Sequence, residues 1–357
     1  MQHRLQALRK ALTEWQADAI ITGKPVNRRY ISGFTGSAGW VIVTARDAVL
    51  LTDFRYIDQA KSEAPDFRVI NHERDEKAAI YKQLQELGVK RLAFEKAHIT
   101  FATYEEWSQV FGGVELVPVA GVFEQIRAVK DEDELKVVRE AVRIADEAFT
   151  HILSYIRPGV RELDIALELE FFMRKQGAAS SSFDIIVASG QRGALPHGAA
   201  SEKEIAAGEL VTLDYGALYK GYCSDITRTV AVGEPPAKMR EIYEIVLEAQ
   251  LNGVGSIKSG MTGKEADALT RDIIAAAGYG AEFGHSTGHG FGLEVHEAPS
   301  LAMSSQTVLK PGMLVTVEPG IYLSGVGGVR IEDDVLITES GCEILTKSPK
   351  ELLILPV

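Results

Sequence analysis

The sequence predicts two domains, an α/β domain over residues 1–125 and an α+β domain over residues 126–357. The first observation is length, because 357 residues exceed one typical domain. The second is that helix-like and strand-like segments alternate early in the chain, whereas hairpins flanked by long helices fill the rest. The third is charge: residues 1–125 hold 16 basic and 16 acidic side chains, so the whole net charge of −12 lies in residues 126–357.

The composition excludes several classes of protein. Hydrophobic residues make up 46 % and charged residues 25 %, which is ordinary for a globular protein and argues against disorder as the main state. A net charge of −12 argues against a nucleic-acid partner, which needs a basic face, and against docking on anionic lipid. The acidic excess of the second domain is therefore either a solvated surface or a cation site.

Cysteine usage and the first residues indicate the compartment. The two cysteines, Cys223 and Cys342, cannot form a disulfide scaffold and fit a reducing compartment. The charged segment 1–18 lacks the uninterrupted apolar core of a signal peptide, and no apolar run approaches the ~20 residues that span a bilayer. We therefore expect a cytoplasmic protein with no membrane partner.

The first domain alternates its elements in a way that is typical of a small α/β domain. Glycine-rich turns lie between Gly33 and Gly39, and residues 121–130 form a crossing segment to the second domain. We expect helices over about residues 2–16, 54–64 and 75–87. We expect strands over about residues 18–22, 40–44, 48–52 and 91–94.

The second domain opens with a strong helix signal. Asp131 can cap this helix, and the acidic residues 131–134 favour its positive end. Apolar residues from Leu135 to Phe149 recur at helical spacing, and the helix ends before Pro158. Further helices are expected over about residues 162–176, 237–258 and 263–277. Strands are expected over about residues 183–187, 210–214, 223–232, 313–318 and 328–338.

Two acidic residues come together in a predicted hairpin. A two-residue turn at 219–220 places Asp214 directly opposite Asp225. A turn at 220–221 instead places the two acids diagonally on the same face. Either register brings them to about the 4.5–5.5 Å Cβ spacing of cross-strand pairs, or slightly beyond. Like charges in such positions are destabilising unless a divalent cation or a shared proton neutralises them. The alternative is an exposed hairpin face.

Two further acids lie in predicted strands: Glu318 ends an otherwise apolar strand, and Glu332 shares one face of a nearby strand with Arg330 and Asp334. Burying either of them unpaired would cost roughly several kcal/mol. A metal ion or the guanidinium of Arg330, which shares a strand face with Glu332, would offset that cost. The alternative is a simple salt bridge between Arg330 and a neighbouring acid.

Histidines gather in a glycine-rich segment. His285, His289 and His296 lie close together in the chain, and glycines flank His289, which suggests backbone held close to a ligand. Ser, Thr and Gly make a helix poor there, and no Glu follows His285, so the segment is not a helical H-E-x-x-H zinc motif. His197 lies on a Pro-His-Gly turn and is a further candidate.

These segments supply one set of candidate metal ligands, which in chain order are Asp214, Asp225, His289, Glu318 and Glu332. Oxygen-rich ligation with one imidazole suits Mn²⁺, Co²⁺, Fe²⁺ or Zn²⁺ rather than a thiolate zinc site. Four carboxylates are too many for one ion but balance two divalent cations in charge. We therefore expect a two-metal site that activates a bridging water.

The motifs that carry these residues resemble those of the pita-bread metallopeptidases, a group that includes methionine aminopeptidase, prolidase and aminopeptidase P. Segments Asn27–Gly39 and Thr52–Tyr56 resemble the N-terminal domain of the proline-directed members. The resemblance implies a creatinase/prolidase-like domain over residues 1–125 and a pita-bread (creatinase/methionine aminopeptidase-like) catalytic domain over residues 126–357. The motifs are Leu213-Asp214-Tyr-Gly, Cys223-Ser-Asp225-Ile-Thr-Arg-Thr, Ser286-Thr-Gly-His289-Gly-Phe-Gly, Val295-His296-Glu-Ala-Pro299, Val317-Glu318-Pro-Gly-Ile-Tyr and Gly328-Val-Arg-Ile-Glu332-Asp.

The resemblance also implies a role for each ligand. Asp214 would chelate one metal ion, while His289 and Glu318 would hold the other. Asp225 and Glu332 would bridge the two ions. Glu318 would in addition act as a general base toward the bridging water.

Three more residues receive roles from the same resemblance. His197 and His296 would bind the peptide and stabilise the tetrahedral intermediate. Arg330 would lie near the prolyl residue or its carboxylate. His285 has no implied ligand role.

The activity that the resemblance implies is hydrolysis of the bond between an N-terminal residue and proline by a metal-bridging hydroxide. Two divalent ions per subunit would be needed, Mn²⁺ or Co²⁺ foremost, with Zn²⁺ or Fe²⁺ as further choices. The partners would be a proline-containing di- or oligopeptide and a second copy of the chain in a homodimer.

Prolidase takes dipeptides and aminopeptidase P longer peptides, and both stay open. An inactive peptide-binding module would have lost a ligand, and a two-metal phosphoesterase would need a cationic cradle; these two functions stay open as well.

Overall fold

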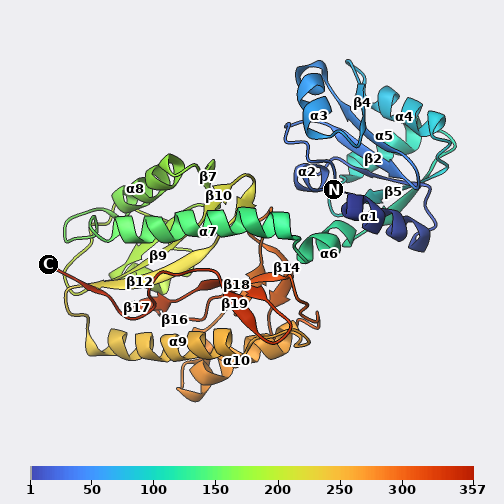
Figure 1. Cartoon of the computed structure of the whole chain (residues 1–357). Helices are drawn as coiled ribbons and strands as arrows, with labels where there is room; N and C mark the ends of the chain where they lie inside the picture. Colours follow the sequence, from blue (N-terminus) through green and yellow to red (C-terminus); the bar gives the residue numbers. More distant parts are fainter. Residues whose placement is uncertain (1) are drawn as a thin grey trace. The chain divides into compact units, whose positions relative to one another are not determined.

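The computed structural model describes residues 2–357, which form two compact units (Figure 1). The first unit ends at Arg127, and the second runs over Ala128–Val357. Among the helices of residues 2–357, none is long and apolar enough to cross a membrane.

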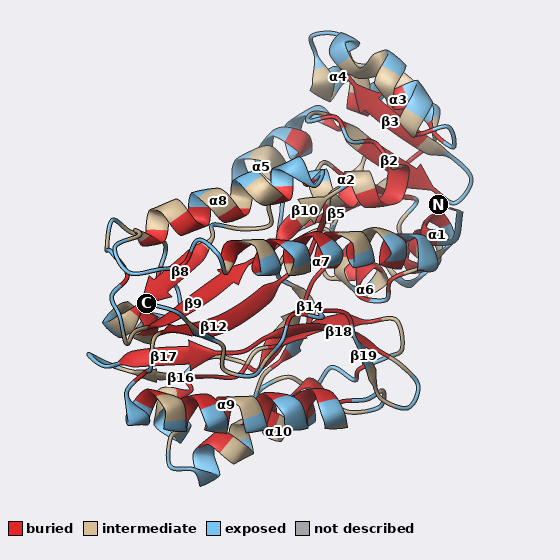
Figure 2. Ribbon diagram, turned by 60° about the vertical axis from the view of Figure 1, so that its left-hand side comes forward, coloured by how far each residue is buried: buried red, intermediate tan, exposed pale blue. Residues whose placement is uncertain are grey.

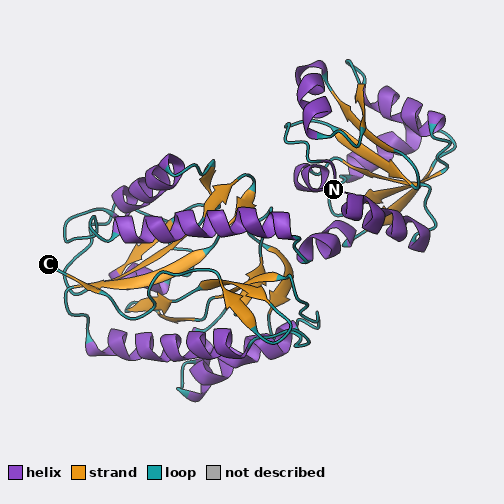
Figure 3. Cartoon of the chain, in the orientation of Figure 1, coloured by secondary structure: helices purple, strands orange, loops and turns teal. Residues whose placement is uncertain are grey.

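The first unit is a mixed sheet in the order β4-β3-β2-β1-β5-β6, flanked by helices (Figure 3). Its strands are β1 (Ala19–Thr22), β2 (Trp40–Thr44), β3 (Ala48–Thr52), β4 (Arg68–Asn71), β5 (Arg91–Glu95) and β6 (Glu115–Val119). Its helices are α1 (Gln2–Glu14), α2 (Pro25–Ser32), α3 (Ile57–Glu63), α4 (Glu76–Glu86), α5 (Phe101–Val110) and α6 (Val122–Ala128), with a 3₁₀ turn at Phe54–Tyr56.

Both faces of this sheet are apolar because side chains alternate along each strand. Ile20 packs in a cluster with Leu8 of α1, whereas its neighbour Ile21 packs in a second cluster with Ile80 of α4. The predicted α/β class is confirmed for this unit. The structure adds α2, α5, α6, β4 and β6, which the sequence interpretation did not include, since residues 121–130 were expected only as a crossing segment.

The second unit holds two main sheets and two pairs of long helices. The helices are α7 (Glu132–Ile152), α8 (Glu162–Lys175), α9 (Ala237–Ser256) and α10 (Gly263–Ala276), with 3₁₀ turns at Gly190–Ala194 and Gly280–Glu282. The first strands are β7 (Ser180–Ser181), β8 (Ile186–Ser189), β9 (Leu210–Tyr215), β10 (Ala217–Tyr219), β11 (Tyr222–Cys223) and β12 (Ile226–Val232). The later strands are β13 (Gly288–Gly290), β14 (Glu297–Leu301), β15 (Leu314–Val317), β16 (Gly320–Leu323), β17 (Gly327–Arg330), β18 (Asp333–Ile337), β19 (Cys342–Ile344) and β20 (Ile354–Leu355).

The sheets of this unit lie between the two helix pairs, with α7 and α8 on one side and α9 and α10 on the other (Figure 1). One sheet has the order β20-β12-β9-β8 and the other β14-β13-β15-β18-β19, and β16 pairs with β17. Val211 and Leu213 of β9 pack toward α7 and α8, while Leu210 packs toward α9. Asp214 shares the face of Leu210, so it points into the interior between the sheets. Figure 2 shows these strands as largely buried.

Helix α7 starts where the sequence predicts. The Asp131 carboxylate accepts hydrogen bonds from the N–H groups of Asp133 and Glu134, and the Glu134 carboxylate accepts one from the Asp131 N–H. Such a capping box contributes about 1 kcal/mol to a helix start.

The hairpin adopts the second of the two registers. Thr227 pairs with Asp214, and Tyr222 pairs with Tyr219, so the turn is Lys220-Gly221. Both turn residues have positive φ, 44° and 80°, which suits the right-handed twist of the flanking strands.

The predictions of continuous strands over 223–232 and 328–338 are wrong, because each segment is divided into two strands in the structure. The first breaks between β11 and β12, where the Asp225 N–H donates to Asp334 Oδ2 at 2.9 Å instead of to the ladder. The second breaks between β17 and β18, which belong to different sheets. Glu332 lies in that crossing. Each break therefore puts a candidate ligand at a junction between sheets.

Candidate metal centre

A cavity of about 620 Å³ opens between the sheets of the second unit. This volume is in the ordinary range for a small-molecule site. All eight candidate residues named from the sequence line it, and so does His285. They are His197, Asp214, Asp225, His289, His296, Glu318, Arg330 and Glu332.

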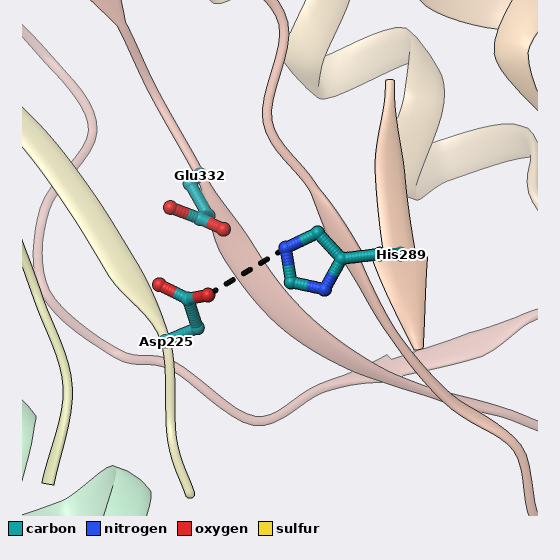
Figure 4. A group of neighbouring side chains, drawn as sticks. All are labelled: Asp225, His289 and Glu332. Atoms are coloured by element: carbon teal, nitrogen blue, oxygen red, sulfur yellow. Dashed lines mark ion pairs between the residues drawn. The ribbon is translucent and has the colours of Figure 1, made fainter. Parts of the chain in front are cut away.

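Three of the five candidate ligands form a tight group. One side-chain atom each from Asp225, His289 and Glu332 lies within 4.8 Å of the others (Figure 4). They come from the break before β12, from β13 and from the crossing before β18, and their polar ends point toward one another. Three segments far apart in the chain thus converge on one point.

Glu318 joins this group through His289. Its Oε1 lies 3.3 Å from His289 Nε2, and Asp225 Oδ2 lies 3.7 Å from the same nitrogen. The hydroxyl of Thr316 fixes both partners, since it donates to Glu318 Oε1 at 3.1 Å and accepts from the His289 N–H at 3.1 Å.

The imidazole of His289 is oriented for ligation. Its Nδ1 lies 3.1 Å from the Gly290 carbonyl oxygen, which can only accept, so Nδ1 carries the proton. Nε2 therefore faces the Glu318 and Asp225 carboxylates, and a metal ion bound between them would take the lone pair of this nitrogen. A backbone carbonyl that fixes the tautomer in this way is typical of metal-binding histidines.

Asp214 lies in the same cavity but outside the tight group. Its Oδ2 accepts a hydrogen bond from Arg330 Nη2 at 2.6 Å. Its Oδ1 is buried and has no hydrogen-bond partner among residues 2–357. A buried carboxylate oxygen without a donor is costly, and a cation would supply the missing partner.

The buried carboxylates of this group need a nearby positive charge to be stable in their ionised form. Burial, followed by the neighbouring Glu332 and Asp214 carboxylates, raises the pKa of Asp225 well above its ordinary value. Burial and the Glu318 carboxylate do the same to the pKa of Glu332. Oxygen ligands, one imidazole and an unpartnered carboxylate oxygen together fit divalent metal ions.

A hydrogen-bond chain runs from Asp214 to His285 through Arg330 and Tyr322. Arg330 Nη1 donates to the Tyr322 hydroxyl at 2.7 Å, and that hydroxyl lies 2.8 Å from His285 Nε2. His285 Nδ1 lies 2.8 Å from the Ser286 carbonyl, and burial lowers the pKa of His285, so Nε2 of the neutral ring accepts from Tyr322. The sequence interpretation assigned no role to Tyr322; its place four residues after Glu318 was the available signal.

His197 and His296 lie at the cavity wall with exposed side chains. The His296 ring packs edge-on against His289, with centroids 4.3 Å apart. Burial and then the neighbouring His289 lower the pKa of His296, which favours the neutral ring. A neutral imidazole donates one N–H, which suits a hydrogen bond to a carbonyl oxygen.

The cavity wall also includes residues that the sequence did not single out, among them Phe183 and Asp184. Both lie just before β8, and Asp184 is exposed. Neither carries a sequence signal, because an isolated Phe-Asp pair in a loop is common.

Comparison with known proteins agrees with this geometry. Residues 136–339 match the model of metallopeptidase family M24, and residues 4–129 match the creatinase/prolidase N-terminal domain. The Xaa-Pro dipeptidase of Pyrococcus furiosus is 43 % identical over 99 % of this chain and 100 % of its own. The structure of the Xaa-Pro dipeptidase from Bacillus anthracis is 56 % identical, with a TM-score of 0.98 over 99 % of each chain. The X-Pro aminopeptidase from Thermotoga maritima is 40 % identical, with a TM-score of 0.91 over 97 % of this chain and 99 % of that one.

The predicted pita-bread catalytic domain and its creatinase-like companion are therefore confirmed. A match to the family model over more than half of the chain, together with relatives that align from end to end, leaves one conclusion. The chain belongs to metallopeptidase family M24 and carries the creatinase/prolidase N-terminal domain ahead of its peptidase domain.

Proposed function

We propose that this protein hydrolyses the peptide bond between an N-terminal residue and proline. The observation that carries the proposal is the convergence of four carboxylates and one imidazole on a single cavity that also holds Arg330 and two exposed histidines. Similar proteins named Xaa-Pro dipeptidase and X-Pro aminopeptidase support the same substrate class.

The ligand set fits two divalent ions, with Mn²⁺ or Co²⁺ foremost and Zn²⁺ or Fe²⁺ as further choices. Asp225 and Glu332 would bridge the ions, Asp214 would hold one, and His289 with Glu318 would hold the other. Once bound, such ions supply an activated water and polarise the scissile carbonyl.

The side chains of the cavity would perform the remaining chemistry. Burial raises the pKa of Glu318, but His289, followed by His285 and Arg330, offsets this, so the pKa of Glu318 lies below its ordinary value. An ionised Glu318 can take a proton from the attacking water. His197 and His296 would donate hydrogen bonds to the peptide carbonyl and to the oxyanion that develops there. Arg330 would face the prolyl end of the substrate.

Turnover of Ala-Pro and Ala-Pro-Ala, with Mn²⁺ and after chelation, tests the proposal. Cleavage of the dipeptide alone identifies a prolidase, and cleavage of the tripeptide identifies an aminopeptidase P. The proposal predicts cleavage of at least one of these peptides and none of Ala-Ala. Activity that survives complete metal removal would refute the two-metal assignment.

Two further assignments belong to the same proposal. The chain would work in the cytoplasm, which the two free cysteines Cys223 and Cys342 support. It would form a homodimer, as the resemblance implies, and light scattering of the purified protein tests this directly.

A further inference from the structure

The turn that carries His197 is locally tight. The Gly198 N–H donates to the Leu195 carbonyl at 3.0 Å, and the Ala199 N–H donates to the His197 carbonyl at 2.8 Å. The imidazole itself is exposed, so side-chain packing does not fix it. The position of His197 over the cavity therefore depends on how the loop over residues 189–201 is tied to the rest of the unit.

One buried carboxylate, Glu162 at the start of α8, binds both ends of this loop. Its Oε1 accepts from the N–H and the hydroxyl of Ser189, at 2.7 and 2.8 Å. Its Oε2 accepts from the N–H and the hydroxyl of Ser201, at 3.2 and 2.6 Å. The side chain of Glu162 is 0 % exposed, so water does not compete for these bonds. Hydrogen bonds to an ionised acceptor are roughly twice as strong as neutral ones.

Arg192 extends the same contact across the loop. Its Nε donates to Glu162 Oε2 at 2.9 Å, and its Nη2 donates to the Ala199 carbonyl at 2.5 Å, two residues beyond His197. Glu162 and Arg192 thus connect the ends and the middle of the loop to the start of one helix.

The loop also packs closely on the strand that carries Arg330. A Cβ on Gly328 of β17 would overlap the Gly193 carbonyl oxygen, so the two backbones touch without side chains between them. A displacement of the loop would therefore move His197 relative to Arg330 and the ligands. Catalytic geometry tolerates little of this, since a shift of about 1 Å can cost on the order of 100-fold in rate.

We propose that Glu162 is a positioning residue for His197, a buried carboxylate that holds loop 189–201 so that the exposed imidazole reaches a peptide bound in the cavity. Glu162 does not itself line the cavity. Its hydrogen bonds to the loop go to Ser189, Arg192 and Ser201, none of which is a candidate metal ligand. The proposal rests on the proposed function, because His197 has a task only if a peptide binds there.

Amide hydrogen exchange tests the structural half of the proposal without any assay of activity. Glu162→Gln replaces one acceptor oxygen by an NH₂ group that faces at least two donors. Arg192→Gln removes the connection to Ala199 at a side chain that is 30 % exposed, so it is the milder variant if Glu162→Gln folds poorly. Glu168→Gln is the matched control, because Glu168 lies on the same helix but binds His151 of α7, at 2.6 Å.

Both loop variants should speed exchange of the amides of residues 190–200 by about 10-fold or more through local opening, while the rest of the second unit and the Glu168→Gln control stay unchanged. Unchanged protection of this loop in both variants would overturn the proposal.

A double-mutant cycle on Ala-Pro hydrolysis tests the functional half. Glu162→Gln should lower kcat/KM by about 10- to 100-fold in the parent but by less than about 3-fold in a His197→Ala background. An equal loss in both backgrounds would show a merely structural role and refute the positioning role. If the parent cleaves no Xaa-Pro peptide while the loop amides respond as expected, the proposed function fails and the loop contact itself stands.

Discussion

Arg330 Nη2 lies 2.6 Å from Asp214 Oδ2, deep in the second unit, where the side chains are 4 % and 12 % exposed. The other nitrogens of the same guanidinium bind Tyr322 and Thr227. Arg330 thus neutralises one candidate ligand and organises the wall of the cavity next to it. The stability of the site should therefore change when the charge of either partner is removed.

Arg330→Met should destabilise the metal-free protein by about 3–5 kcal/mol, because it leaves Asp214 buried without its cation. Divalent metal should recover part of this loss by binding the same carboxylate. Urea denaturation in chelator and in Mn²⁺ measures both effects. Arg139→Met is the control: Arg139 pairs with Glu343 on the surface, and its loss should cost less than about 1 kcal/mol. If metal-free Arg330→Met is as stable as Arg139→Met, the buried Asp214 does not depend on Arg330 for its stability.

Asp225→Asn should abolish activity while leaving the fold intact. The metal-free variant should be at least as stable as the parent, because one of several mutually repelling buried carboxylates is gone. Its thermal midpoint should respond little to Mn²⁺. Asp184→Asn, which changes an exposed acid of the same cavity outside the ligand group, should keep the full metal response. A fully active Asp225→Asn protein would refute the bridging role.

Chelation should abolish activity and lower the thermal midpoint of the parent, since the carboxylates then face one another without metal ions. At free metal about 100-fold above Kd, one bound ion stabilises the fold by about 2.7 kcal/mol. Calorimetry across a metal titration measures this gain. Restoring Mn²⁺ should restore the thermal midpoint and the activity together. A thermal midpoint that does not change with metal concentration would contradict a metal site in this cavity.

Glu95→Gln should change how the stability of the first unit depends on pH. Burial raises the pKa of Glu95 above its ordinary value of 4.5, although Thr22 and Asn27 donate hydrogen bonds to it. The folded state then binds more protons than the unfolded state above pH 4.5, so the parent loses stability as pH rises from there toward the folded pKa. Glutamine removes this loss.

Urea denaturation between about pH 4 and 8 tests the Glu95 prediction. The advantage of Glu95→Gln over the parent should grow with rising pH. Glu115→Gln, at an exposed carboxylate paired with Arg91, should run parallel to the parent. Parallel curves for Glu95→Gln and the parent would contradict the predicted direction.

The turn at Lys220-Gly221 should respond in opposite directions to two substitutions. Gly221→Ala should destabilise the unit by about 1 kcal/mol, because φ is +80° there. Lys220→Asn should stabilise it slightly, because Asn-Gly is the preferred pair for a turn with two positive φ values. Thermal melts of both variants measure the pair of effects, and a stabilising Gly221→Ala would show that the turn has another geometry.

The sequence alone determined the two domain classes, the cap of α7 and the identity and order of the candidate ligands. Each of these depends on short-range information, such as the period of apolar residues, a capping pattern within four residues, or an acid inside an apolar strand. That is why Asp214, Asp225, His289, Glu318 and Glu332 could be named before any geometry was known.

Only the tertiary structure decided how these residues meet. The hairpin register left two choices open because both turns put the acids on one face, and the backbone of Lys220-Gly221 selected the diagonal one. Arg330 and Asp214 are 116 residues apart in the chain, and Glu162 reaches both ends of the His197 loop without lying in any motif. Contacts of this kind depend on how sheets and loops pack against one another, and local sequence patterns do not predict that packing.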